Sequence, residues 1–139
     1  MEGILCRVRR RRTQPDPIAR NVAAGIGAVR TAIGIGMLIA PRTSLAALGF
    51  RGAEGPIIAI TRLAGSRDLA LGVLAIAALQ DRRRLREISL ASAGVDAADA
   101  ASFAIALLRR EGPDLGAGIG VATATQAAIV GAWVANRLK

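Results

Sequence analysis

The chain has 139 residues, of which 53% are hydrophobic and only 2% aromatic, and its formal net charge is +9. Its mean hydropathy of +0.42 is higher than a soluble domain of this length usually shows. The lack of histidine excludes imidazole bases and His-based metal or haem sites, and the single cysteine, Cys6, excludes an intrachain disulfide. We expect one domain with no metal site, no cofactor and no catalytic residue, since P-loop, HExxH and GxSxG motifs are also missing.

Residues 1–20 form a basic arm that we expect to be disordered. Pro15 and Pro17 are expected to break any helix here, and five arginines precede them: Arg7, Arg9, Arg10, Arg11 and Arg12. Such an arm is typical of a cytoplasmic tail that contacts anionic lipid headgroups. A nucleic-acid-binding arm is the alternative, but no aromatic residue alternates with these arginines, so no nucleic acid is expected.

Four apolar segments follow, at about 21–41, 57–79, 88–108 and 115–135, each long enough to cross a bilayer as a helix. The first could instead be a cleaved signal peptide, but Arg30 interrupts it and no small-x-small cleavage site follows. Pro41 ends this segment, and Thr43–Phe50 could form a short interfacial helix. Asp81–Glu87 is expected to be a tight basic turn. The sequence thus predicts an all-α fold, a four-helix transmembrane bundle over 21–135 with a tail at 136–139.

The distribution of basic residues predicts the orientation of this bundle. With the N-terminus inside, twelve Lys and Arg residues lie on the inner side, four on the outer side and three within spans, which accounts for all 19. Cytoplasmic loops carry such an excess of positive charge. Both termini should therefore be cytoplasmic, and the protein should be a multi-pass protein of the cell membrane. Arg82, Arg83 and Arg84 are expected to join the arm in contacting anionic headgroups.

Polar residues recur near the centre of all four segments. They are Arg30, Arg67, Asp68, Asp96, Asp99 and the neutral Gln126. A charge facing lipid at this depth costs at least ~2.5–3.5 kcal/mol, so these groups should meet inside the bundle. We expect Arg30 and Arg67 to meet Asp96 and Asp99, with Asp68 completing the network, because a planar guanidinium can bridge two carboxylates. Formal charge within the spans balances, with the three arginines Arg30, Arg62 and Arg67 against three aspartates, and Arg62 could reach the outer interface.

The network has two interpretations that remain open. It could be an ion-pair lock that specifies helix register, or it could line a small-ligand site or a proton or ion path. An intramembrane aspartyl protease is disfavoured, since such enzymes place their aspartates on two helices, whereas Asp96 and Asp99 share one.

Small residues recur at every fourth position of segment four: Gly116, Gly120, Ala124, Ala128 and Ala132. This stripe allows another backbone to approach closely, either within the bundle or across a homodimer. Trp133 is expected in the aromatic belt at the inner interface.

The run Gly65-Ser-Arg67-Asp68-Leu-Ala-Leu-Gly72, followed by a basic turn and then Asp96-Ala-Ala-Asp99, resembles a family of small bacterial four-span membrane proteins catalogued as a domain of unknown function. The resemblance covers about residues 25–135 and implies a four-helix membrane fold without an activity. DoxX-like membrane proteins share this general architecture. We therefore expect a non-enzymatic membrane protein. The alternatives are a transporter or membrane oxidoreductase subunit that uses the central charges, and a soluble Ala-rich helical bundle.

Overall fold

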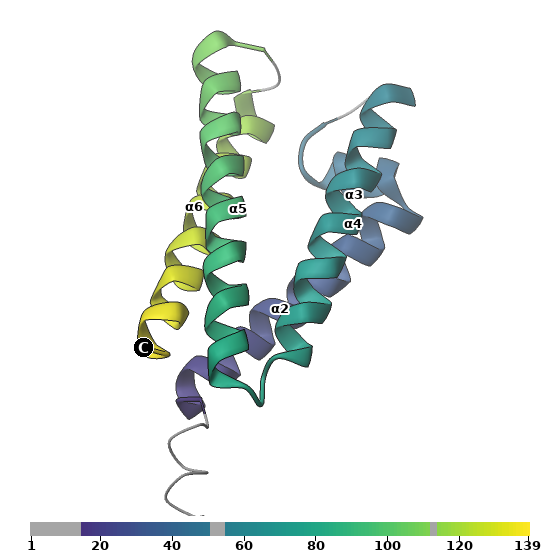
Figure 1. Ribbon diagram of the computed structural model, residues 1–139. Coiled ribbons are helices and arrows are strands. Elements are labelled where there is room, and N and C mark those ends of the chain that lie inside the picture. The colour runs from purple at the N-terminus through teal and green to yellow at the C-terminus, as the bar shows by residue number, and fades with distance from the viewer. Residues whose placement is uncertain (1–14, 51–54, 112–113) are drawn as a thin grey trace, which may run out of the picture.

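The computed structural model describes residues 15–50, 55–111 and 114–139, and the regular structure in these ranges is entirely helical. The order of elements is α2 (Pro17–Ile39), α3 (Pro41–Ala47), α4 (Gly55–Ala77), α5 (Arg82–Arg109) and α6 (Asp114–Arg137), as Figure 1 shows. The long helices α2, α4, α5 and α6 correspond to the four segments expected from the sequence. The arginines of the basic arm, Arg7 to Arg12, lie outside the described residues.

Helix α2 begins earlier than expected, at Pro17. Asp16 caps it, because its side chain accepts a hydrogen bond from the Ile18 amide at 3.1 Å. Proline is favoured at the first helical position, where its missing N–H would have no intrahelical partner anyway. Residues 17–20, which were expected to belong to the disordered arm, are therefore part of α2.

The basic stretch at Asp81–Glu87 is also helical, and the expected turn there was wrong. Asp81 caps α5 by accepting hydrogen bonds from the amides of Arg83 and Arg84, both at 3.0 Å. An exposed ion pair between Arg83 and Glu87, at 2.9 Å, spans one helical turn. Arg82 instead donates to the Leu138 carbonyl at 3.3 Å. The chain reverses before Asp81, so α5 begins with its arginines already in the helix.

Helix α3 covers part of the expected interfacial helix and packs on the protein. Its Leu45 is buried, and Leu48 and Phe50 are half-buried. A Cβ added to Gly116 would lie 2.8 Å from the Phe50 ring, so this segment reaches the beginning of α6.

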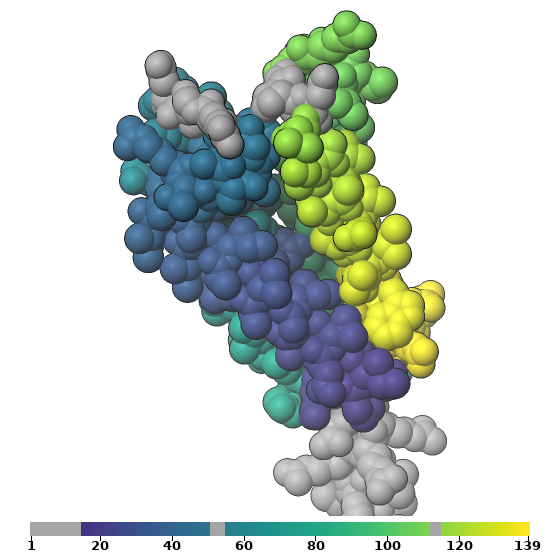
Figure 2. Space-filling view, turned by 180° about the vertical axis from the view of Figure 1, so that it is seen from behind, coloured from purple at the N-terminus to yellow at the C-terminus, as the bar shows by residue number. Residues whose placement is uncertain are grey.

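The four long helices form two pairs, α2 with α4 and α5 with α6, and contacts between the pairs are much sparser. The pairs converge where α2 begins and α6 ends, and they diverge toward the other end (Figure 1). A small apolar core fills the convergent end; it contains Ala19, Ala23, Ala78, Leu85, Val134 and Leu138. Figure 2 shows a hollow between α2 and α6 beyond the point where they meet. Packing within each pair therefore contributes more contact than packing between pairs.

Large apolar side chains are mostly on the outside of the molecule. Leu63, Ile39 and Leu108 are 71%, 78% and 83% exposed, and all four long helices carry such residues. Among the described residues, three helices are long and apolar enough to cross a membrane: α2, α5 and α6. Helix α4 is as long as α2, but every 18-residue stretch of it contains three charged residues, Arg62, Arg67 and Asp68.

Candidate functional site: an Arg/Asp network between two helix pairs

Helices α2 and α4 approach closely because glycines face one another across the pair. A Cβ on Gly34 would lie 2.6 Å from the Gly65 carbonyl oxygen, and a Cβ on Gly72 would lie 2.7 Å from the Gly27 carbonyl oxygen. Both distances are well inside van der Waals contact, so no larger residue fits without moving a backbone. Gly34 meets Gly65 and Gly27 meets Gly72, which means that the helices are antiparallel.

A charged residue lies between the two glycines of each helix. The spacing is the same in both: Gly27-x2-Arg30-x3-Gly34 in α2 and Gly65-x2-Asp68-x3-Gly72 in α4. Residues three and four apart share a helix face, so Arg30 and Asp68 both lie on the glycine-lined interface. Arg30 Nη1 donates to Asp68 Oδ1 at 2.7 Å. The close approach of the two backbones thus sets the first ion pair.

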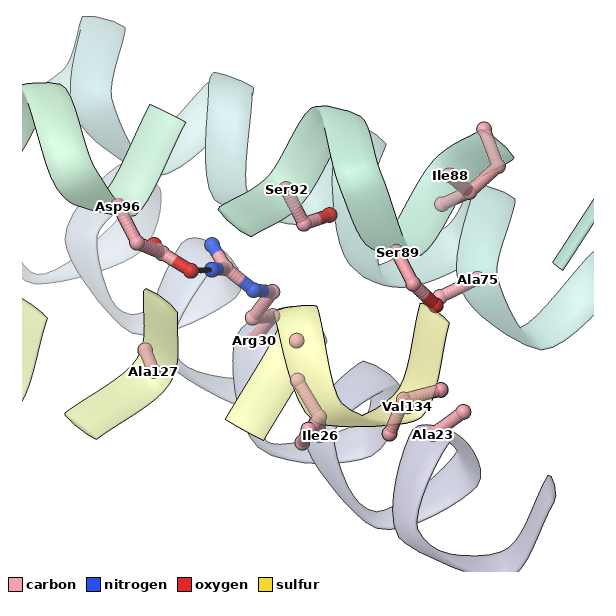
Figure 3. A pocket seen from close by; sticks show the side chains of 11 residues that line it. Ala23, Ile26, Arg30, Ala75, Ile88, Ser89, Ser92, Asp96, Ala127 and Val134 are labelled. Carbon is pink, nitrogen blue, oxygen red and sulfur yellow. Dashed lines mark hydrogen bonds and ion pairs between the residues drawn. The ribbon is translucent and has the colours of Figure 1, made fainter. Parts of the chain in front are cut away.

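Two further ion pairs connect this helix pair to α5. Arg30 Nη2 also donates to Asp96 Oδ2, and Figure 3 shows the Arg30 side chain extending from α2 toward Asp96. Arg67 binds Asp99 through two parallel hydrogen bonds, Nη1 to Oδ1 at 2.9 Å and Nη2 to Oδ2 at 2.7 Å. This two-pronged geometry is the strongest that a guanidinium and a carboxylate can adopt. The five side chains Arg30, Arg67, Asp68, Asp96 and Asp99 are called the Arg/Asp network below.

Helix geometry explains how one helix can serve two neighbours. Arg67 and Asp68 are consecutive, so they point about 100° apart around α4. Asp68 faces α2, whereas Arg67 faces α5, and Arg67 Nη2 remains 3.9 Å from Asp68 Oδ1. Asp96 and Asp99 divide in the same way between Arg30 and Arg67. The network therefore touches three helices and crosses from one pair to the other twice.

Burial is uneven across the network. The Arg30 and Asp96 side chains are 10% and 8% exposed, whereas those of Arg67 and Asp99 are 39% and 29% exposed. The Arg30–Asp96 contact therefore lies in the interior, and the Arg67–Asp99 contact lies nearer the opening between the pairs. Removing one partner costs more in the interior than at an exposed site, because the remaining charge is left without water to compensate it.

Two polar residues considered from the sequence lie outside the network. Arg62 is exposed on α4, and Gln126 is exposed on α6 rather than facing the bundle interior. Without Arg62, the network has two guanidinium groups against three carboxylates, which is a formal charge of −1 when all five are ionised. The expected charge balance therefore does not hold within the network itself.

A small cavity lies beside the Arg30–Asp96 contact, between the helix pairs. Its polar lining consists of Arg30, Asp96, Ser89 and Ser92, and about 20 Å³ is open to the centres of water-sized molecules (Figure 3). This is room for about one water molecule. Arg30 Nε is buried and has no hydrogen-bond partner among the described residues. Within those residues, no group of three or more Cys, Asp or Glu could hold a metal ion.

The small-residue stripe of α6 matches the packing face only over its first half. Gly116 is buried against the Phe50 segment, and a Cβ on Gly120 would lie 2.6 Å from the Phe103 ring of α5. Four residues turn a helix by about 400°, so a strict every-fourth pattern drifts by about 40° at each step. Ala132 is consequently exposed, and Gly131 takes its place against Ser89 and Ala93 of α5.

Sequence reasoning missed the glycines that bring α2 and α4 together: Gly27, Gly34, Gly65 and Gly72. A signal for them was present, because each helix has two glycines seven residues apart around a charged residue. Glycine is common in spanning helices, so composition alone did not separate these four from Gly25 or Gly36.

Comparisons of this chain with protein-family models, with curated proteins and with solved structures found no match.

Proposed function

We propose that this chain is an integral membrane protein with four transmembrane helices, and that the Arg/Asp network is a lock that holds its two helix pairs together. The observation that carries the proposal is the position of Arg30, which ion-pairs with Asp68 in its own helix pair and with Asp96 in the other. Contacts between the pairs are much sparser than contacts within them. The ion pairs therefore join the two helix pairs across an interface that has few other contacts.

The exposed apolar surface supports the membrane environment. The most apolar 18-residue windows of α2, α5 and α6 are only 22%, 11% and 17% buried within the molecule. A soluble helical bundle would hide such windows in its core, because apolar area in water costs about 25 cal/mol per Å². In a bilayer the same surface faces lipid at no such cost. The interior composition agrees, since glycine, alanine and serine permit close packing between membrane helices.

Helix α4 is the fourth span in this proposal. Its length equals that of α2, and Arg67 and Asp68 both have partners inside the molecule. Only Arg62 would remain without a partner in the network. Arg62 lies nearer the beginning of α4, which is the outer end in this orientation. From there its long side chain can extend to the outer membrane–water interface.

The proposed orientation has both termini in the cytoplasm. The beginning of α2 and the end of α6 lie at the same end of the molecule (Figure 1). That end also carries the arginines at the beginning of α5, of which Arg83 and Arg84 are exposed and suited to anionic headgroups. The excess of basic residues on this side supports a cytoplasmic location. The likeness to small bacterial four-span proteins in Gly65–Gly72 agrees with this topology.

An exchange of charges within the network tests the lock. Arg67→Asp or Asp99→Arg alone places like charges in contact, and we expect loss of folded protein from the membrane fraction. The double variant Arg67→Asp/Asp99→Arg restores opposite charges across the same gap and should recover much of it. Arg83→Glu/Glu87→Arg exchanges an exposed pair and is the matched control, for which single and double variants should behave like the parent.

Abundance after carbonate washing and thermal stability in detergent are the measurements. A double variant no more stable than the worse single variant would mean that this ion pair does not hold the helix pairs together. Release of the parent chain into the carbonate wash would contradict the membrane assignment itself.

A second candidate function is binding or passage of a proton or small cation at the network, as in a transporter or a membrane oxidoreductase subunit. The formal charge of −1 and the water-sized cavity beside Asp96 favour it. Proteoliposomes that contain the folded charge-exchange variant separate the two functions. A lock predicts no proton or sodium flux from either the parent or the variant, whereas a path predicts flux in the parent that the variant reduces.

A further inference from the structure

Gln126 is an exposed amide near the middle of an apolar helix. It lies close to the midpoint of α6, at the depth that the Arg/Asp network occupies in the other helices. Among the described residues it has no hydrogen-bond partner. In the proposed membrane setting its side chain faces the hydrocarbon region. An amide there has two N–H donors and a carbonyl acceptor without water to bind, which is unfavourable.

The residues that share this face of α6 permit another helix to come close. Ala122, Ile129 and Trp133 are four, three and seven residues from Gln126, and all three are exposed. Ala122 is small and lies one turn from the amide, where a neighbouring backbone would need space. This face is distinct from the one that contacts α5, which includes Gly120 and Gly131.

We propose that a second copy of this chain covers the Gln126 face, forming a two-fold dimer through α6 with reciprocal hydrogen bonds between the two Gln126 side chains. This inference rests on the proposed membrane function. An amide is both donor and acceptor, so it is complementary to itself across a two-fold axis. Two copies that are inserted in the membrane in the same orientation also have their Gln126 side chains at the same depth in the bilayer. Lipid tails cannot supply these hydrogen bonds. Hydrogen bonds between side chains such as Gln on neighbouring helices contribute to helix association in membranes.

The dimer is tested with the full chain in lipid vesicles, in a Cys6→Ser background. Single cysteines at Ala122 and Ile129 should form disulfide-linked dimers on oxidation. Cysteines at Val29 and Ile33, which are exposed apolar positions on α2, are matched controls and should not. Energy transfer between labelled copies, measured as the protein is diluted into lipid, gives the dissociation constant.

Gln126→Leu should raise this dissociation constant about five- to tenfold, since two interhelical bonds are lost, whereas Gln126→Asn should retain most of the association. Equal cross-linking at α2 and α6 positions, or a Gln126→Leu variant that associates like the parent, would overturn the dimer. A parent chain that is monomeric in lipid would also contradict the dimer. In that case lipid or a different protein covers the Gln126 face of α6.

Carbonate washing of the same samples separates failure of this inference from failure of the proposed function. A chain that stays in the membrane but is monomeric contradicts only the dimer. A chain released by carbonate contradicts the membrane assignment on which the dimer depends.

Discussion

Replacing Gly34 with alanine should separate α2 from α4 and destabilise the protein. The added Cβ would lie 2.5 Å from the Leu69 amide nitrogen and 2.6 Å from the Gly65 carbonyl oxygen. Carbon atoms in contact normally lie about 3.5–4.0 Å from a neighbour, so the helices must part by about 1 Å. Both opposing atoms belong to the backbone and cannot rotate away.

The magnitude follows from two opposing effects. Overpacking of this kind costs about 1–3 kcal/mol. Alanine is favoured over glycine in a helix by about 0.8–1.0 kcal/mol, which offsets part of that cost. Gly25→Ala is the matched control, because it lies in the same helix with no atom within 4 Å of the added Cβ. Both variants gain the same propensity, so the free energy of unfolding of Gly34→Ala should be about 1–3 kcal/mol lower than that of Gly25→Ala.

Equilibrium unfolding in mixed detergent micelles, with the denaturing detergent as the variable, gives both free energies. The parting of the helices also lengthens the 2.7 Å contact between Arg30 and Asp68, so Gly34→Ala should weaken the network as well. If Gly34→Ala is as stable as Gly25→Ala, the close approach of α2 and α4 is wrong, and so is the register that pairs Arg30 with Asp68.

Two further predictions concern single side chains. Asp96→Asn removes one ion pair of the buried Arg30 guanidinium while its ion pair with Asp68 remains, and should destabilise the protein by about 1.5–3 kcal/mol, whereas Asp99→Asn, at the more exposed Arg67, should cost less. The same unfolding titration checks both variants, and equal losses would contradict the difference in burial. Asp81→Ala removes the cap of α5 and should cost about 1 kcal/mol, while Asp81→Asn retains an acceptor and should cost less. An alanine variant as stable as the parent would mean that the cap contributes nothing.

The pairing of the charges shows where inference from sequence ends. That Arg30, Arg67, Asp68, Asp96 and Asp99 should avoid lipid follows from the cost of charge in hydrocarbon, and it needs no tertiary structure. Which carboxylate each guanidinium binds does not follow, because every Arg–Asp combination has the same chemistry. The choice depends on the crossing of α2 and α4, and that crossing depends on Gly27, Gly34, Gly65 and Gly72.

Local signals also had limits at the helix ends. Asp16 with Pro17 and Asp81 with the arginines after it are start signals for helices, whereas proline and a run of charge at the same places favour a break and a turn. In both cases the capping aspartate marks the beginning of the helix in the structure. The drift of the α6 packing face, from Gly120 to Gly131 rather than to Ala132, could have been obtained from the helical repeat alone.

The sequence alone determined the approximate position and apolar character of the long helices and the central position of their charged residues, because these depend on composition and on distance along the chain. Only the tertiary structure decided that the helices form two pairs, that Arg30 serves both Asp68 and Asp96, and that Gln126 faces outward. These features depend on how helix faces rotate to fit one another. That rotation is set by contacts between residues far apart in the chain, and no local pattern specifies it.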